Sequence, residues 1–155
     1  MNGRVIQSET EMKWLGEALG VALEGGEVLE LIGDVGAGKT TLTKGIAAAL
    51  GITEPVQSPT FTISRVYLAP GGLELHHYDF YRLGEAGIMG DEIQEVMARP
   101  ENVTIVEWAG AVDHVLPDDR LVVKITATSE DERQVEMTPT GERARGLLRR
   151  MEDAK

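Results

Sequence analysis

One glycine-rich segment of this chain indicates its chemistry most directly. Residues 33–40 read Gly-Asp-Val-Gly-Ala-Gly-Lys-Thr, which matches the phosphate-binding pattern G-x-x-x-x-G-K-[ST] at every fixed position. The glycines permit a tight turn that aims several backbone N–H groups into one nest, and a following helix adds the positive end of its dipole. Lys39 is then placed to neutralise β- and γ-phosphates, and the Thr40 hydroxyl to bind Mg²⁺. We call residues 33–40 the phosphate loop.

The segments on either side of the phosphate loop are those that the motif requires. Residues 28–32 form a short apolar run typical of a buried strand. In residues 41–50 the apolar positions recur at helical spacing, and Gly51 is expected to end that helix. This context favours phosphate binding over a glycine-rich turn that binds nothing. The residues expected to bind the nucleotide phosphates are Gly33, Asp34, Val35, Gly36, Ala37, Gly38, Lys39, Thr40 and Thr41.

Acidic residues at the ends of two predicted strands could complete the site. A phosphate loop needs a carboxylate that holds Mg²⁺, commonly at the end of a neighbouring hydrophobic strand. Glu107 directly follows the apolar residues 103–106, so we predict that it holds the metal together with Thr40. A solvated charge at a strand end is the alternative for Glu107. Asp79 ends a second predicted strand, where it could orient the attacking water or assist the metal.

Other polar residues near these strands have less specific interpretations. Arg82 could contact phosphate or pair with a surface carboxylate. His76 and His77 suggest zinc, but adjacent strand residues point to opposite faces, so a shared metal site is disfavoured. Residues 58–60, Ser-Pro-Thr, could bring a hydroxyl to the γ-phosphate as switch loops do, or could form a plain proline turn.

Composition indicates an ordinary globular protein that forms a single domain over residues 1–155. Of its residues 42% are hydrophobic and 26% charged, and the absence of cysteine excludes disulfides and thiolate metal sites. We expect a cytoplasmic protein, because no apolar run has the length of a signal peptide core or a membrane span. The net charge of −11 argues against strong nucleic-acid binding by the chain itself, so a partner would have to supply such contacts.

The remaining pattern predicts an α/β fold with P-loop NTPase-like, three-layer architecture. A central, mostly parallel sheet with antiparallel hairpin additions is expected, because buried strands alternate with helices and two strand pairs are joined by turns. Ser8 to Glu11 has the form of a capping box, which should open a helix. The buried side of that helix is expected at Met12, Leu15, Leu19 and Ala22. The other predicted elements are hairpins formed by residues 60–67 with 73–78 and 121–125 with 135–137, and helices at 91–98 and 140–153.

Four motifs together resemble the bacterial TsaE (YjeE) family. They are residues 33–41, Ser-Pro-Thr-Phe at 58–61, His-Tyr-Asp-Phe-Tyr-Arg at 77–82, and Val-Glu-Trp at 106–108. The similarity covers roughly residues 8–128. S-P-T-F combined with H-x-D-x-Y-R is far more specific than the phosphate loop alone. From Arg133 onward the chain carries no matching signature.

The resemblance implies a small P-loop ATPase that uses ATP and Mg²⁺. In that family the ATPase is needed for threonylcarbamoyl modification of adenosine 37 in tRNAs that read codons starting with A. It acts in a complex with TsaB and TsaD, of which TsaD transfers the threonylcarbamoyl group, and its ATP cycle resets the complex. The resemblance thus implies that tRNA is contacted indirectly, through the partners, which agrees with the acidic composition.

The resemblance also implies roles for individual residues. Thr10 would lie near the adenine, and Thr40 with Glu107 would hold Mg²⁺. Trp108 would contact the site or a partner, unless it is a structural tryptophan. The switch-like and catalytic surround of the phosphates would comprise Lys39, Ser58, Thr60, Asp79, Tyr81 and Arg82. The C-terminal basic cluster, Arg143, Arg145, Arg149 and Arg150, is either a solvated helix face or a contact with tRNA or an acidic partner.

Slow ATP hydrolysis that becomes productive in a complex is therefore the leading hypothesis. A GTPase of the Ras type is disfavoured, because the sequence contains neither N-K-x-D nor D-x-x-G. A small-molecule kinase remains an alternative, although the stretch between the phosphate loop and Glu107 is short for an enclosing lid. A nucleotide-gated binding module is the second alternative.

Overall fold

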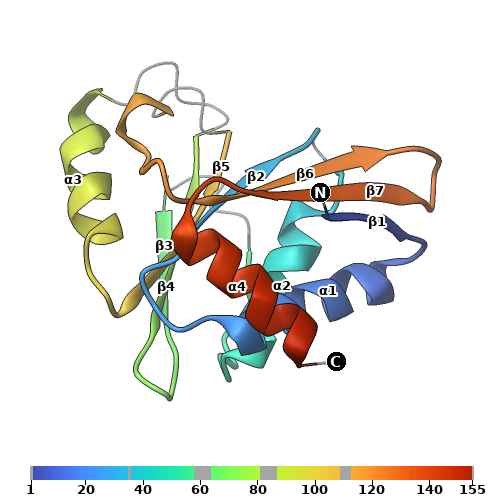
Figure 1. Ribbon diagram of the computed structural model, residues 1–155, viewed down its shortest axis with the longest axis horizontal. Coiled ribbons are helices and arrows are strands. Elements are labelled where there is room, and N and C mark those ends of the chain that lie inside the picture. Colours follow the sequence, from blue (N-terminus) through green and yellow to red (C-terminus); the bar gives the residue numbers. More distant parts are fainter. Residues whose placement is uncertain (1, 35, 58–63, 81–86, 109–112, 155) are drawn as a thin grey trace.

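The computed structural model describes residues 2–34, 36–57, 64–80, 87–108 and 113–154 (Figure 1). The helices of this part are α1 (Glu9–Ala22), α2 (Lys39–Ala49), α3 (Gly87–Met97), α4 (Glu142–Asp153) and a 3-10 turn η2 (Asp113–Val115). The strands are β1 (Asn2–Ile6), β2 (Val28–Ile32), β3 (Ser64–Leu68), β4 (Glu74–Asp79), β5 (Asn102–Glu107), β6 (Leu121–Ala127) and β7 (Arg133–Pro139).

The described strands form one seven-stranded sheet in the order β1-β7-β6-β2-β5-β4-β3. The four middle strands, β6, β2, β5 and β4, run parallel. Antiparallel neighbours extend the sheet at both ends, β3 beside β4 and the pair β7 and β1 beyond β6. The prediction of a mostly parallel sheet with antiparallel hairpin additions is confirmed.

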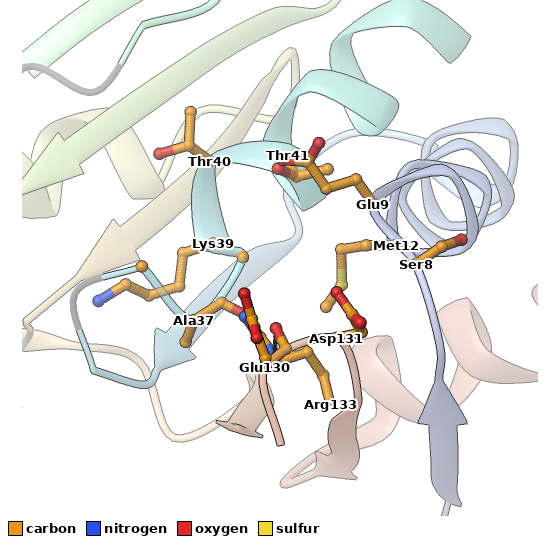
Figure 2. A pocket seen from close by; sticks show the side chains of 12 residues that line it. Ser8, Glu9, Met12, Ala37, Lys39, Thr40, Thr41, Glu130, Asp131 and Arg133 are labelled. Atoms are coloured by element: carbon orange, nitrogen blue, oxygen red, sulfur yellow. Dashed lines mark hydrogen bonds between the residues drawn. The ribbon is translucent and has the colours of Figure 1, made fainter. Parts of the chain in front are cut away.

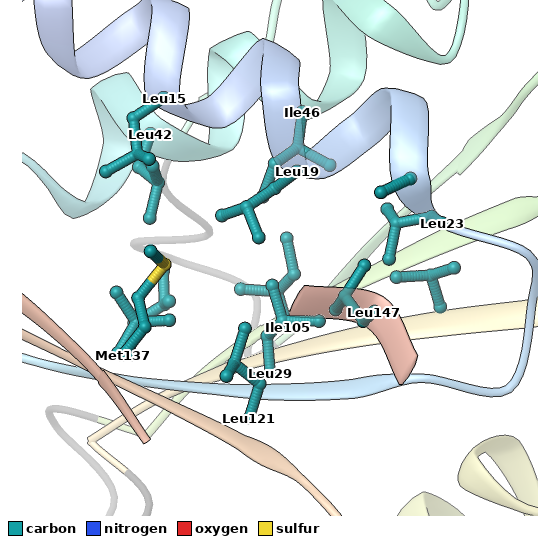
Figure 3. Packing of buried hydrophobic residues seen from close by; sticks show 14 of the residues in the cluster. Leu15, Leu19, Leu23, Leu29, Leu42, Ile46, Ile105, Leu121, Met137 and Leu147 are labelled. Atoms are coloured by element: carbon teal, nitrogen blue, oxygen red, sulfur yellow. The ribbon is translucent and has the colours of Figure 1, made fainter. Parts of the chain in front are cut away.

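Helices cover both faces of the sheet, which gives three layers. Helices α1, α2 and α4 lie on one face and α3 on the other (Figure 1). The larger core lies under α1, α2 and α4, where Leu19, Leu42 and Ile46 of the helices meet Leu29 and Ile105 of the strands (Figure 3). A second core under α3 contains Tyr78, Phe80, Ile93, Val106 and Leu116. Strand β5 is buried along its whole length, because parallel central strands are covered on both faces.

Glycines bring α1 and α2 into backbone contact. A Cβ atom at Gly16 would lie 2.2 Å from the carbonyl oxygen of Leu42, and one at Gly45 would lie 2.2 Å from the carbonyl oxygen of Lys13. Only glycine allows so close an approach. The first turn of α1 therefore lies against the phosphate loop, with the Met12 methyl 3.1 Å from where a Cβ of Gly38 would be.

Local signals correctly predict the start of α1 and the end of α2. The Ser8 hydroxyl accepts a hydrogen bond from the Glu11 amide at 3.1 Å, and the four residues expected on the buried side of α1 are buried. Gly51 has φ +82° and follows α2, with its amide bonded to the Ala48 carbonyl and that of Ile52 to the Ala47 carbonyl. These two bonds form a Schellman motif.

Several elements differ from the predicted ones. Strand β1 was not predicted, because an edge strand in which Val5 is exposed carries little hydrophobic alternation. Helix α2 begins at Lys39 instead of residue 41, because the phosphate loop continues directly into the helix. Helix α3 begins at Gly87 instead of residue 91. Residues 60–63 of the predicted hairpin lie outside the described residues.

Candidate nucleotide-binding site

Residues far apart in the sequence meet at one edge of the sheet. Strands β2, β5 and β4 are parallel neighbours, in which Leu31 pairs with Glu107 and Glu107 pairs with Asp79. Their carboxyl ends lie side by side, and the phosphate loop leaves β2 at this edge. Ligands of open α/β sheets bind in this position. The two acidic residues singled out from the sequence are thus adjacent to the phosphate loop.

The phosphate loop has the backbone conformation that its glycines predict. Gly36 and Gly38 adopt φ values of +82° and +117°, in the left-handed region that side chains disfavour. Gly38 is the N-cap of α2, and no side chain in the described part of the protein caps that end. The first amides of α2 are therefore oriented for an anion at the helix N-terminus.

Lys39 is folded back onto the loop that carries it. Its Nζ atom donates a hydrogen bond of 2.6 Å to the Gly33 carbonyl and lies 3.8 Å from Oε1 of Glu107. The lysine side chain is 6% exposed and the glutamate side chain 3%. Burial lowers the pKa of the Lys39 ammonium, while nearby carboxylates, Glu107 first, act in the opposite direction. The ammonium also lies over the Trp108 ring.

Glu107 has a second buried partner, His77. Oε2 of Glu107 contacts Nε2 of His77, whose side chain is fully buried. Sequence reasoning considered His77 for zinc and as the first residue of the H-x-D-x-Y-R motif, but gave it no role in the site. The available signal was its spacing of two residues from Asp79, which puts both side chains on one face of β4. His76 points to the other face and contacts Oε1 of Glu74 at 3.3 Å, so the expected divergence of the two histidines is confirmed.

A cavity of about 290 Å³ opens beside the phosphate loop (Figure 2). The loop forms one wall, the first turn of α1 a second, and the turn between β6 and β7 a third. Outside the loop and the start of α2 the cavity is lined by Ser8, Glu9, Met12, Glu130, Asp131 and Arg133. Lys39 and Thr40 extend away from Ser8 and Met12 in Figure 2, so the two groups of side chains lie on different sides of the loop.

Arg133 ties the β6–β7 turn (residues 128–132) to the phosphate loop. Its Nε atom donates to the Ala37 carbonyl at 3.1 Å. Its Nη1 atom donates to the carbonyls of Ser129, Glu130 and Glu132 at 3.0, 3.1 and 3.0 Å. One guanidinium group therefore connects the third wall of the cavity to the first. Sequence reasoning did not identify Arg133, because these partners are backbone carbonyls that no side-chain motif records.

Only some of the other candidate residues line the cavity. Thr40 and Thr41 line the cavity, whereas Thr10 is exposed in the first turn of α1 and is not among the lining residues. Asp34 is exposed at the loop. Four predicted catalytic or switch residues and one loop residue lie outside the described residues: Val35, Ser58, Thr60, Tyr81 and Arg82.

Two members of the C-terminal basic cluster contact residues outside α4. Arg150 donates to the Ala22 carbonyl at 2.8 Å and pairs with Oε2 of Glu27 at 3.0 Å. Arg143 donates to the Gly25 carbonyl at 3.0 Å. Both side chains hold α4 against the segment that follows α1. They therefore have a structural role, whatever else the cluster contacts.

The described residues contain neither a cluster of metal-ligating side chains nor a helix that could cross a membrane. No set of three or more histidine, aspartate or glutamate side chains among them could hold a metal ion. None of the helices described has the length and hydrophobicity that crossing a membrane requires.

Comparisons with known proteins point to one family over most of the chain. The family model described as threonylcarbamoyl adenosine biosynthesis protein TsaE matches residues 6–135. The tRNA threonylcarbamoyladenosine biosynthesis protein TsaE of Bacillus subtilis is 41% identical over 144 residues, covering 90% of this chain and 86% of the relative. The protein of the same name from Streptomyces coelicolor is 39% identical over 140 residues, with 85% and 93% covered. The crystal structure of Bacillus subtilis YdiB matches with a TM-score of 0.82 at 33% identity, over 99% of this chain and 95% of that one. With the fold, the sequence and the family model in agreement, this chain belongs to the TsaE family of tRNA threonylcarbamoyladenosine biosynthesis.

Proposed function

We propose that the protein is a Mg²⁺-dependent ATPase that serves threonylcarbamoyl modification of tRNA adenosine 37 in a complex with TsaB and TsaD. The observation that carries the proposal is the position of Lys39 and Glu107. The cation of the phosphate loop and a buried carboxylate from β5 lie 3.8 Å apart at the carboxyl edge of the sheet. Each is positioned to bind one part of a Mg²⁺–triphosphate group.

The phosphate loop supports the triphosphate part of this proposal. The start of α2, which no described side chain caps, offers backbone N–H groups, and Lys39 adds a positive charge beside them. When phosphate arrives, Lys39 would exchange its bond to the Gly33 carbonyl for bonds to phosphate oxygens. The negatively charged ligand would then also offset the cost of keeping an ammonium buried.

The residues present fit a magnesium ion. Mg²⁺ prefers oxygen ligands and is usually held by one or two protein groups together with substrate phosphates and water. The Glu107 carboxylate and the Thr40 hydroxyl are the residues that would hold it. When bound, the ion would neutralise the negative charge that develops on the phosphates during transfer.

The cavity beside the phosphate loop supports a nucleoside as the rest of the ligand. It continues from the phosphate nest toward Met12 of α1 and toward Arg133 at the start of β7. The Met12 side chain offers an apolar surface for a base, and Ser8, Glu9 and Asp131 provide polar groups at the edges. The assignment to adenine follows the family resemblance and the missing guanine motifs.

The catalytic step is proposed to depend on Asp79 and on groups brought in by partners. Asp79 lies next to Glu107 in the register of β4 and β5, where a carboxylate could orient water toward the γ-phosphate. Thr60 and Arg82 are proposed to complete the surround. Phosphoryl transfer relies on positioning and charge stabilisation, so a missing group can come from a neighbouring protein. With a net charge of −11, the chain would reach tRNA through TsaB and TsaD.

The test is phosphate release from ATP by the purified protein, alone and with TsaB, TsaD and substrate tRNA. Lys39→Ala should abolish hydrolysis, and Glu107→Ala should weaken Mg²⁺-dependent hydrolysis more than it alters the fold. Lys44→Ala, on the exposed side of the same helix, is the matched control and should behave as wild type. Wild-type turnover in the Lys39 or Glu107 variant would refute the site assignment. Transfer of phosphate to an added metabolite would instead favour the small-molecule kinase.

A binding module whose nucleotide only gates complex formation is tested separately. A variant that binds ATP without hydrolysing it should fail to support repeated cycles of tRNA modification. Full multiple-turnover modification by such a variant would favour the binding module.

A further inference from the structure

We propose that His77 is a positioning residue that fixes the Glu107 carboxylate for magnesium binding. The inference rests on the proposed Mg²⁺–ATP function and adds a residue to that site. The interaction that carries it is the contact between Nε2 of His77 and Oε2 of Glu107, two side chains that are 0% and 3% exposed.

The two oxygens of Glu107 face different sides of the site. Oε2 is held by His77 from within the sheet, whereas Oε1 faces the Lys39 ammonium at 3.8 Å. At that distance the two groups form an ion pair but no direct hydrogen bond. Oε1 is therefore the oxygen directed toward the phosphate loop and able to accept a metal ion. Anchoring Oε2 removes the rotation that would otherwise move Oε1 away.

The chemistry of the pair fixes the direction of the hydrogen bond. A carboxylate can only accept, so His77 donates from Nε2. No group in the described part of the chain accepts or donates at Nδ1 of His77. Among the described residues, Glu107 is thus the one hydrogen-bond partner of this fully buried ring. Hydrogen-bonded partners behind a metal ligand typically affect metal affinity or activity by about 10- to 100-fold.

Strand geometry explains why His77 can reach Glu107. His77 pairs with Ile105, two residues before the pair of Asp79 with Glu107. His77 shares a face of the sheet with Asp79 on its own strand, because residues two apart point the same way, and the imidazole is the diagonal neighbour of Glu107 on β5. His76 faces the other side of the sheet and contacts Glu74, so it provides a control of the same residue type one position away.

The test measures metal affinity directly. Binding of Mn²⁺ to the complex with a non-hydrolysable ATP analogue is followed by electron paramagnetic resonance, and nucleotide binding is measured separately in EDTA. We expect His77→Leu to weaken Mn²⁺ binding by about 10-fold or more and to leave metal-free nucleotide binding unchanged. His77→Gln, which can place an N–H donor near the Nε2 position, should restore most of the affinity. His76→Leu should leave it unchanged.

Each other result bears on the inference. Wild-type Mn²⁺ affinity in folded His77→Leu protein would overturn it, because a merely structural hydrogen bond would change stability alone. If that variant does not fold, His77→Asn replaces it, since its shorter side chain does not reach Oε2, and an unchanged Mn²⁺ affinity would again overturn the inference. A wild-type protein that binds no nucleotide would overturn the proposed function, and the role of His77 with it.

Discussion

The Nζ atom of Lys39 lies 3.9 Å from the centroid of the Trp108 ring. A cation above an indole face is attracted by about 0.5–2 kcal/mol, more when water is excluded. Trp108 follows Glu107 and has φ +57°, a conformation that a bulky residue rarely adopts. The end of β5 therefore presents a carboxylate and an aromatic face to the same ammonium group.

Binding of a triphosphate should change the fluorescence of Trp108. When Lys39 turns toward phosphate, the charge above the indole ring moves, and the emission should change saturably. The exposed Trp14 is removed by Trp14→Phe so that the remaining signal comes from one residue. Tripolyphosphate should produce the same change as ATP. An emission that stays constant while calorimetry records nucleotide binding would contradict this account of Lys39.

Asp79→Ala should reduce ATP turnover by at least about 100-fold while nucleotide affinity is kept, because a water-orienting carboxylate acts mainly in the transition state. Turnover is measured as phosphate release and affinity by calorimetry. Glu74→Ala, at the other end of β4, serves as the control. Equal turnover in the Asp79 variant and the control would give Asp79 a structural role.

Addition of TsaB and TsaD should raise ATP turnover by at least about tenfold, since stabilising groups supplied in trans can contribute far more than that. Steady-state phosphate release with and without the two proteins measures the effect. A rate that is already maximal for the isolated chain, and indifferent to both proteins, would exclude activation by the complex.

Arg133→Gln should weaken binding of ATP more than binding of tripolyphosphate. Loss of the guanidinium releases the β6–β7 turn, which forms the cavity wall beyond the phosphate nest. Competition binding with both ligands measures the difference, with the exposed Arg145→Gln as control. An equal loss for the two ligands would mean that Arg133 acts on the phosphate loop alone.

Gly16→Ala and Gly45→Ala should each destabilise the fold by about 1–3 kcal/mol, the usual cost of overpacking. The added methyl group would collide with a backbone carbonyl, 2.2 Å away in both cases. Urea denaturation measures the loss. Gly71→Ala is the control, because nothing lies within 4 Å of its Cβ position. Wild-type stability in either helix variant would show that α1 and α2 can separate without cost.

The sequence was most informative where the residues of a functional motif are adjacent in the chain. The phosphate loop was predictable because its glycines, lysine and threonine follow one another, and Glu107 because it ends an apolar run. His77 was not, because its role depends on the register of β4 against β5, across 30 residues. A shift of one residue would direct it to the other face of the sheet.

The cavity wall formed by the β6–β7 turn was equally hidden. It exists because β6 lies beside β2, so the turn that follows β6 reaches the same edge of the sheet as the phosphate loop. The sequence predicted the hairpin but not its neighbour. Arg133 then fixes the turn through backbone carbonyls, whose positions depend on the fold and not on residue type.

The close crossing of α1 and α2 has a consequence for nucleotide exchange. Because the two backbones approach so closely at Gly16 and Gly45, we expect α1 and α2 to have little freedom to move relative to each other. Any opening of the cavity would then occur on the opposite side, where the Arg133 guanidinium holds the β6–β7 turn against the phosphate loop. We expect product release to require the Arg133 bond to the Ala37 carbonyl to break and the β6–β7 turn to move, while α1 and α2 keep their positions.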